Sequence, residues 1–370
     1  MIVYIKNKLE VIAFLSLFFS LSAYGSIDFI GKSINSGNAS SPVIALDENH
    51  NPYVLYQEGN ESKIKKYNGY IWESLVDIGD DTPGYNTHTI DFTLSASRVP
   101  YVAYRSTKDG ETIVKRLNGS SWEKIGSIAK EYSSSYHIRI AIGSDDVPWV
   151  ASYNTGSKQV LRFDGSSWLP AGSFESSGAM HRLGFTLDPQ SNLPYIAYSD
   201  PISSAGSLGP ATVKRFNGTE WVIVGKHQFT IENVRGVDLA ISHHDGAPYI
   251  VGNSTSMKFN SATSVWEELG DFNTGVISDD YRVTIGLDGT PYASFRSGDG
   301  PFGPFELNII AFNGESWSSI FDQKIDGISD LDMVSGSLNK TYVSYVENGK
   351  INVIRISESL PKETLFILLN

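Results

Sequence analysis

The chain has 370 residues, carries a formal net charge of −12 and contains no cysteine. The negative charge argues against nonspecific binding to nucleic acid or to an anionic membrane, because both attract basic proteins. Without cysteine, the protein has neither a disulfide framework nor a thiol-linked lipid anchor. The length also exceeds the roughly 250–300 residues at which one undivided hydrophobic core usually stops growing, so a single domain of this size needs a repeated architecture.

Residues 1–25 have the pattern of a secretory signal peptide. Lys6 and Lys8 precede an apolar stretch at residues 11–21, and residues 23–25 (AYG) form a small-x-small cleavage site. The apolar stretch is shorter than the roughly 20 residues of a membrane-spanning helix. We therefore expect a mature protein without a membrane span, exported to the periplasm or the extracellular space.

From residue 26 onward, one phrase of about fifty residues recurs seven times. Its first half is an apolar strand followed by a proline and an apolar/tyrosine run, as in PYVLY at residues 52–56, PYVAY at residues 100–104 and PYIAY at residues 194–198. Its second half is a basic strand that closes on Asn-Gly-x-x-Trp or a close variant. Six of the seven tryptophans occupy this last position, namely Trp72, Trp122, Trp168, Trp221, Trp266 and Trp317.

Each repeat divides into four short strands. Strand A is apolar, strand B opens with the proline, which is tolerated at a strand start, and strand C alternates apolar and basic residues. The Asn-Gly or Asp-Gly pair predicts a tight hairpin between strand C and strand D, and strand D begins at the tryptophan. No convincing helix follows residue 25. The pattern predicts an all-β fold, a seven-bladed β-propeller of four-stranded blades.

The two ends of the repeat region complement each other. Repeat seven reaches strand C at residues 351–356 and lacks its tryptophan strand, whereas residues 27–33 (IDFIGKS) match the strand D pattern of residues 122–127 (WEKIGS). A last blade completed by the first strand leaves the ring without free sheet edges. We therefore predict one closed propeller domain over residues 26–357, followed by a C-terminal tail at residues 358–370.

These repeats resemble the PYVAY/NGxxW repeats of exported bacterial β-propellers over residues 26–357, a resemblance that implies fold rather than function. The turn before each tryptophan is also distantly similar to the Asp-box of sialidase-like propellers. The spacing of Asp164, Gly165 and Trp168 lacks the extra residue that an Asp-box has between Asp and Gly. Sialidase activity is therefore not implied.

Departures from the repeat indicate where a ligand site could lie. The connections from strand B to C and from strand D to A vary in length, and in a propeller they surround one mouth of the central channel. In one of them, residues 297–305, Phe302 and Phe305 could stack on a sugar. When the repeats are aligned on the last apolar residue of strand A, five successive blades direct His, Tyr or Arg toward this mouth: His88, Tyr136, His137, His181, Arg182, Arg235, Tyr281 and Arg282.

Two interpretations of these polar residues stay open. They either cap the blade ends, or they form a polar, partly cationic pocket for a hydroxyl-rich or carboxylated ligand. The pocket would make the protein a monomeric binding module for a glycan or a protein ligand, without cofactor or metal. The alternative is a polysaccharide lyase acting on a uronic acid, in which Arg neutralises the carboxylate and His or Tyr abstracts the C5 proton. Its catalytic residues would be Tyr136, His137, His181 and Arg182.

Overall fold

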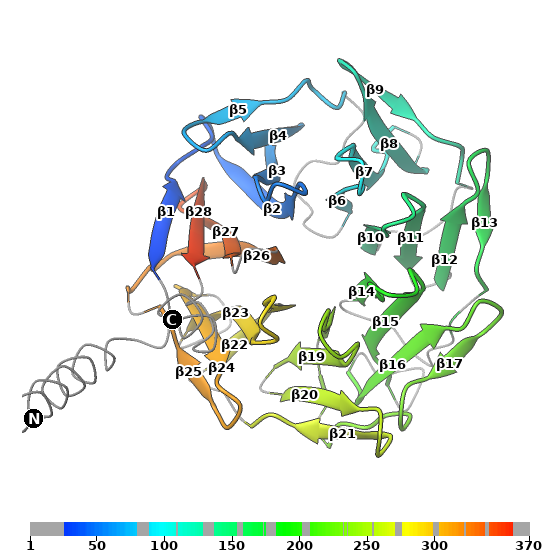
Figure 1. Ribbon diagram of the computed structural model, residues 1–370. Helices are drawn as coiled ribbons and strands as arrows, with labels where there is room; N and C mark the ends of the chain where they lie inside the picture. Colours follow the sequence, from blue (N-terminus) through cyan, green and yellow to red (C-terminus); the bar gives the residue numbers. More distant parts are fainter. Residues whose placement is uncertain are drawn as a thin grey trace, which may run out of the picture.

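The computed structural model describes residues 26–79, 89–108, 110–128, 137–153, 158–172, 174, 183–201, 208–231, 233–234, 236–253, 255–270, 276–298, 303–321, 323–336 and 340–357, without the side chains of residues 276–279. Within these ranges the chain forms 28 strands and no helix, and therefore no helix that could cross a membrane. The strands make seven antiparallel sheets of four strands each, arranged as blades around a central axis (Figure 1). The predicted seven-bladed β-propeller is confirmed.

In each blade the strands are named A to D from the axis outward. Blade 1 comprises β2 (Ala39–Leu46), β3 (Pro52–Glu58), β4 (Glu61–Tyr67) and β5 (Trp72–Ser74); blade 2, β6 (Ile90–Leu94), β7 (Pro100–Arg105), β8 (Thr112–Asn118) and β9 (Ser121–Lys124); blade 3, β10 (His137–Ile142), β11 (Pro148–Tyr153), β12 (Lys158–Phe163) and β13 (Trp168–Pro170); blade 4, β14 (Leu183–Leu187), β15 (Pro194–Ser199), β16 (Ala211–Phe216) and β17 (Trp221–Ile223); blade 5, β18 (Asp238–Ile241), β19 (Pro248–Gly252), β20 (Thr255–Asn260) and β21 (Val265–Glu268); blade 6, β22 (Val276–Ile285), β23 (Pro291–Gly298), β24 (Glu306–Phe312) and β25 (Trp317–Ser319); blade 7, β26 (Ile328–Gly336), β27 (Lys340–Glu347), β28 (Lys350–Ser357) and β1 (Ile27–Gly31).

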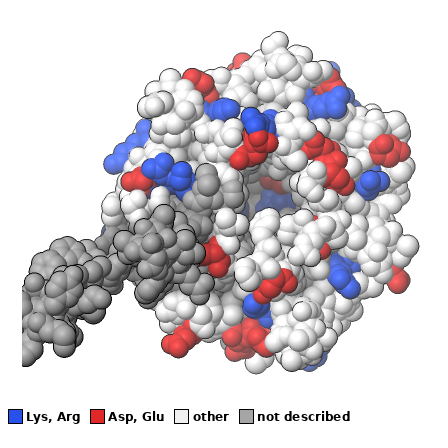
Figure 2. All heavy atoms as spheres, in the orientation of Figure 1, with Lys and Arg blue, Asp and Glu red and all other residues white. Residues whose placement is uncertain are grey.

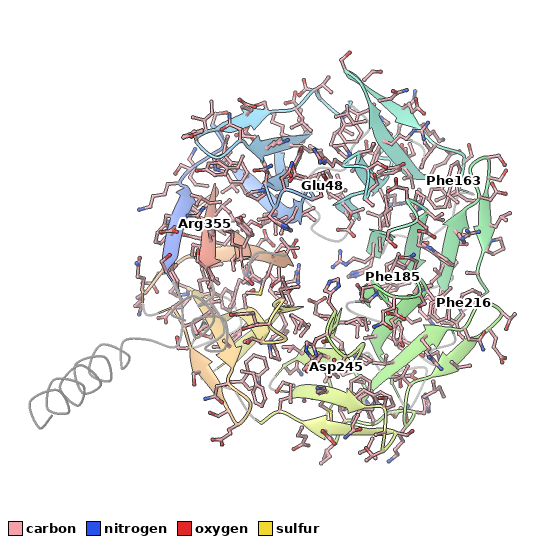
Figure 3. The ribbon with its side chains drawn as sticks, in the orientation of Figure 1. Glu48, Phe163, Phe185, Phe216, Asp245 and Arg355 are labelled. Carbon is pink, nitrogen blue, oxygen red and sulfur yellow. The ribbon has the colours of Figure 1, made fainter. Side chains whose placement is uncertain are left out.

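Blade 7 is closed by the first strand of the chain, as the sequence predicts. β1 pairs antiparallel with β28, with Ile27 opposite Ile356. The side chains of the facing residues Asp28 and Arg355 also form an ion pair at 2.7 Å, and Figure 3 labels Arg355 on this blade. β1 thereby covers the edge of β28 that would otherwise be exposed, and blade 7 has four strands like the other blades.

The hydrophobic core is divided into layers between the blades. One cluster joins Tyr53 and Leu55 of blade 1 to Phe92 and Val102 of blade 2, and the other seams have clusters of the same kind. The second tyrosine of strand B lies at the centre of these layers and is at most 3% exposed in blades 1–4 and 7. Each blade is therefore stabilised mainly by its two neighbours.

The conserved spacing of the tryptophans has a structural cause. In five blades the indole Nε1 donates a hydrogen bond to a backbone carbonyl at the outer strand of the preceding blade. The acceptors are Ile30 for Trp72, Val76 for Trp122, Ile125 for Trp168, Ala171 for Trp221 and Val224 for Trp266, at 2.8–3.0 Å. The sixth, Trp317, donates instead to the hydroxyl of Ser256 in blade 5 at 2.9 Å. The tryptophans thus connect the outer rim of the ring.

The turn before each tryptophan forms as the sequence predicts. Gly165 has a φ of 99°, which glycine adopts at little cost. The Asp164 carboxylate accepts hydrogen bonds from the backbone N–H groups of Ser166 and Ser167 at 2.8 and 2.7 Å. This side-chain turn holds the hairpin tight, so Trp168 begins strand D in register.

Candidate functional site in the axial channel

The inner strands of the seven blades line the central channel with a ring of charged residues. Its members are the strand A residues that pair with the residue three positions after the strand B proline, or after Thr341 in blade 7, such as Asp91 opposite Ala103 and Arg139 opposite Ala151. We call this level the charged ring. It consists of Val43, Asp91, Arg139, Gly184, Asp238, Arg282 and Asp332.

The three aspartates of the charged ring make the same contact. Each accepts a hydrogen bond on Oδ2 from a backbone N–H of strand A in the next blade. The donors are Ile140 for Asp91 at 2.8 Å, Val283 for Asp238 at 2.9 Å and Ile44 for Asp332 at 2.9 Å. Strand A has no neighbouring strand on its axial side, so some of its N–H groups need other partners. The aspartates supply these partners and join the blades at the axis.

Arg282 is held firmly by carboxylates. Its Nε lies 2.6 Å from Asp332 Oδ1, and its Nη1 lies 3.7 Å from Asp280 Oδ1. Burial alone would lower the pKa of the guanidinium, but Asp332, Asp280 and Asp238 outweigh burial and raise it. Arg296 approaches Asp280 from the other side at 3.2 Å. The charge of Arg282 is therefore already compensated by the protein.

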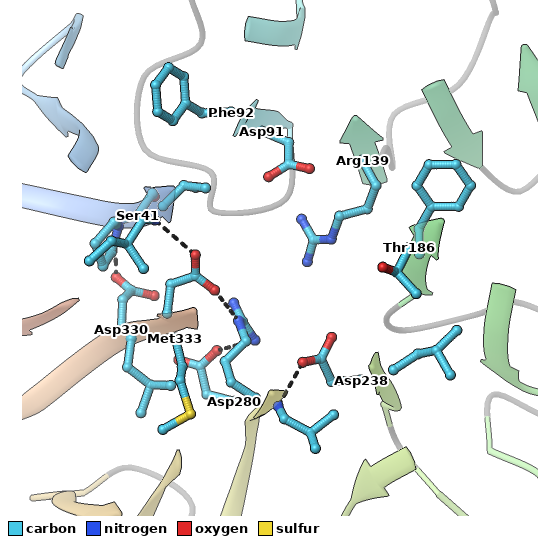
Figure 4. Close-up of a pocket in the computed structure, with 18 of the residues that line it drawn as sticks. Ser41, Asp91, Phe92, Arg139, Thr186, Asp238, Asp280, Asp330 and Met333 are labelled. Atoms are coloured by element: carbon cyan, nitrogen blue, oxygen red, sulfur yellow. Dashed lines mark hydrogen bonds and ion pairs between the residues drawn. The ribbon is translucent and has the colours of Figure 1, made fainter. Parts of the chain in front are cut away.

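Arg139 occupies the equivalent position in blade 3, where the carboxylates of Asp91 and Asp238 act on it only at longer range. Its Nη1 donates to the carbonyl of Ile138 at 3.3 Å, as Arg282 does to the carbonyl of Tyr281. It forms no ion pair with any residue that the structure describes. Figure 4 shows its guanidinium extending from β10 into the channel, between Asp91 and Thr186 and across from Asp238. Arg139 can therefore donate hydrogen bonds to a ligand.

A polar cavity of about 200 Å³ surrounds this guanidinium and is lined by strand A of all seven blades. The space-filling view shows the hollow at the centre of the ring, with basic and acidic atoms in its wall (Figure 2). Burial raises the pKa of the Asp91 carboxyl to about 6, against the lowering effects of Arg139 and the Ile140 N–H. Burial raises the pKa of Asp238 as well. Both carboxylates therefore gain from a partner that donates hydrogen bonds.

Of the candidate residues derived from the sequence, four lie in the described part of the chain. Arg282 alone lines the cavity. His137 begins β10 and stacks on Tyr153, with ring centroids 4.6 Å apart. Tyr281 is only 3% exposed and packs in the core between blades 5 and 6, and the Phe305 ring lies under Arg296 at 4.9 Å. The other candidates lie outside the described residues, namely His88, Tyr136, His181, Arg182, Arg235 and Phe302.

The sequence alignment was wrong by two residues in blade 6. It used Leu287 as the last apolar residue of strand A, but Leu287 follows the strand and is 48% exposed. Ile285 pairs with Pro291 there, as Leu94 pairs with Pro100 in blade 2. Arg282 is consequently level with Arg139, and His137 is level with Asp280.

Sequence reasoning therefore missed most of the charged ring. Asp91, Arg139, Asp238 and Asp332 were not among the candidates. A signal was present, because five of the seven repeats have a charged residue three positions before the strand A residue that pairs with the strand B proline, or with Thr341 in blade 7. Aligning the repeats on the strand B proline would have revealed it.

Comparison with known proteins identifies the fold alone. No protein-family model matches the chain, and no curated protein matches it. Among solved structures, an arginine mutant of AofleA from Arthrobotrys oligospora is similar at 11% identity and a TM-score of 0.52, over 81% of this chain and 92% of that one. The lectin AAL of Aleuria aurantia, in complex with Fucα1-6GlcNAc, is similar at 12% identity and a TM-score of 0.51, over 78% and 96%. The SapL1 lectin with alpha methyl fucoside reaches 14% and 0.51, over 77% and 96%.

Proposed function

We propose that the protein is a glycan-binding module that holds its ligand in the axial cavity. One observation carries this proposal: the guanidinium of Arg139, which has no ion-pair partner among the described residues, shares a small polar cavity with Asp91, Asp238 and Thr186. The backbone N–H groups of Ile140 and Val283 donate to Oδ2 of Asp91 and of Asp238, and both carboxylates line the cavity. Donors and acceptors therefore face the same space.

This combination suits a sugar. Hydroxyl groups both donate and accept, so a sugar can accept hydrogen bonds from the guanidinium and donate to the carboxylate oxygens. The cavity volume of about 200 Å³ corresponds to roughly six or seven water molecules at about 30 Å³ each. That space fits one monosaccharide unit rather than a long polymer segment. Because the lining residues lie on strands, little ordering cost accompanies binding.

The comparisons and the sequence support the proposal in different ways. Two propellers of similar fold, AAL and SapL1, are lectins in complex with fucose-containing ligands, so this type of scaffold serves glycan recognition elsewhere. We further propose that the protein is exported, on the signal-peptide pattern of residues 1–25. The N-terminus of the protein recovered outside the cytoplasm tests this, since cleavage after Gly25 should leave Ser26 first.

The decisive experiment compares Arg139→Gln with a matched surface variant. Arg162→Gln removes a cation from the same blade, on an exposed part of strand C outside the cavity. Binding to a panel of neutral, amino and acidic glycans is measured by calorimetry for both variants and for the unmodified protein. We expect Arg139→Gln to lose at least tenfold in affinity and Arg162→Gln to bind normally. Equal affinities of all three proteins would remove the axial cavity as the site.

A separate experiment tests the alternative that the protein is a polysaccharide lyase. Of its four candidate residues, the described structure contains only His137, whose ring stacks on Tyr153. Absorbance of an unsaturated uronate product during incubation with uronic-acid polysaccharides would support the lyase. Glycan binding without absorbance would support the binding module. If neither is observed, a protein ligand becomes the next candidate.

A further inference from the structure

The axial channel has a second chamber beyond the polar cavity. It measures about 490 Å³ and opens toward the turns that join strands A and B. Ile44 and Phe92 belong to the walls of both the polar cavity and this turn-side chamber. The two spaces therefore adjoin, and one ligand can occupy both.

The turn-side chamber is wide because the next level of the channel is built from small residues. In strand A, the residue directly after each member of the charged ring belongs to the core between the blades. The residue after that points to the channel again, and its side chain is short in most blades. This second level consists of Ala45, Thr93, Ala141, Thr186, Ala240, Thr284 and Val334, each opposite the aromatic residue that follows the strand B proline, or Thr341 in blade 7. Short side chains leave the axis open at this depth.

The walls of the turn-side chamber are apolar and polar in nearly equal parts. The apolar part comes from aliphatic side chains of strand A in four blades, among them Leu46, Leu94, Ile142 and Val334. The acidic residues of the chamber lie on the turn after β2. They already have partners within the protein.

Those partners leave the acidic side chains little capacity for a ligand. Asp47 accepts hydrogen bonds from the backbone of Asn49 and Asn51, both at 2.9 Å, and its carboxylate lies 3.4 Å from Lys66. Glu48 forms an ion pair with Arg98. Strand A of four blades therefore offers apolar contact in this chamber, whereas the charged ring next to it offers hydrogen bonds.

We infer that the ligand is amphiphilic: a glycoside whose sugar occupies the polar cavity and whose apolar aglycone, an alkyl or aryl group, extends into the turn-side chamber. The inference rests on the proposed glycan-binding function and specifies its ligand class. Burying one methylene contributes about 0.8 kcal/mol, or up to about fourfold in affinity. Even partial burial of an octyl chain is expected to tighten binding by at least tenfold.

Paired glycosides test this inference directly. The affinities of methyl and octyl glycosides of the same sugars are measured by calorimetry on the full exported chain, below the micelle concentration of the octyl compounds. Two variants narrow the turn-side chamber. Thr93→Leu enlarges a side chain at the second level, and Ala96→Leu enlarges one on an exposed turn, where a larger side chain disturbs folding least. Ala262→Leu is the matched control, since it makes the same change on an exposed turn of blade 5 that does not line the chamber.

We expect octyl glycosides to bind at least tenfold more tightly than methyl glycosides. Thr93→Leu or Ala96→Leu should remove most of this gain without weakening binding of the methyl glycoside, and Ala262→Leu should retain the gain. Equal affinity for methyl and octyl compounds would overturn the inference and leave the glycan function standing. If octyl glycosides bind whatever their sugar and methyl glycosides do not bind, the turn-side chamber is supported as a binding site and the glycan function is overturned. Binding of neither would overturn both.

Discussion

Replacing Asp91 by asparagine should stabilise the protein at neutral pH and much less in acid. Burial raises the pKa of this carboxyl from 3.8 to about 6, so the folded state binds the proton more tightly than the unfolded state does. Stability is therefore lost as the pH rises from about 4 to above 6. The shift of about two pH units corresponds to roughly 3 kcal/mol at 1.36 kcal/mol per unit. Asparagine avoids this loss, and its amide oxygen can still accept the Ile140 N–H.

The assay is guanidinium unfolding followed by tryptophan fluorescence at pH 4 and pH 7.5. The difference in unfolding free energy between Asp91→Asn and the unmodified protein should increase by about 2 kcal/mol over this range, because the unfolded carboxyl is already more than half ionised at pH 4. Asp164→Asn is the control, because backbone N–H groups of Ser167 and Ser166 lower the pKa of that exposed carboxyl. Its effect should be constant between these pH values. A constant difference for Asp91→Asn as well would refute the assigned role of burial.

Three further outcomes follow from the fold. Deleting residues 27–33 removes β1, so the edge of β28 becomes exposed, and we expect loss of the cooperative unfolding transition; melting like that of the intact protein would contradict ring closure. Trp266 is 7% exposed and stacks on Phe229, with ring centroids 4.4 Å apart. Trp266→Ala should therefore lower the free energy of denaturant unfolding by about 3–5 kcal/mol. Trp266→Phe, which chiefly loses the indole hydrogen bond, should lower it by about 1–2 kcal/mol. Burial works against ionisation of Glu58, but Lys63 and the Gly37 N–H outweigh it and lower the pKa of this carboxyl to about 2. The ionised Glu58 therefore stabilises the fold above pH 4.5, and this stabilisation disappears toward pH 2. Glu58→Gln should cost about 2 kcal/mol at pH 7 and little at pH 2 in the same assay.

The sequence was sufficient for the fold because six of the seven repeats carry the same local signals. The proline marks the start of strand B, the Asn-Gly or Asp-Gly pair forms the hairpin turn in most of these repeats, and Trp168 or its equivalent marks the outer strand. Even the joining of the chain ends was visible in residues 27–33. These features act over a few residues or between adjacent strands, where sequence patterns are most informative.

The axial site was less accessible for a physical reason. The charged ring depends on which residues of seven separate strands reach the same depth, so an error of two positions moves a side chain to another level. Leu287 caused such an error in blade 6. The pairing of Asp91 with the Ile140 N–H, and the contrast between Arg139 and Arg282, arise from neighbours about fifty residues apart along the chain. No local motif records contacts of this kind.

The meeting of the first and last strands has one more consequence. The backbone N–H of Ser357 donates to the carbonyl of Ser26 at 2.8 Å, so the two ends of the described ring are already adjacent. A short linker between them would make a continuous circle, and a new start could then be cut into any connection between blades. Circular permutants opened between blades 3 and 4, for example, should fold to the same ring, which means that the order of the blades is encoded by their contacts and not by the point where the chain begins.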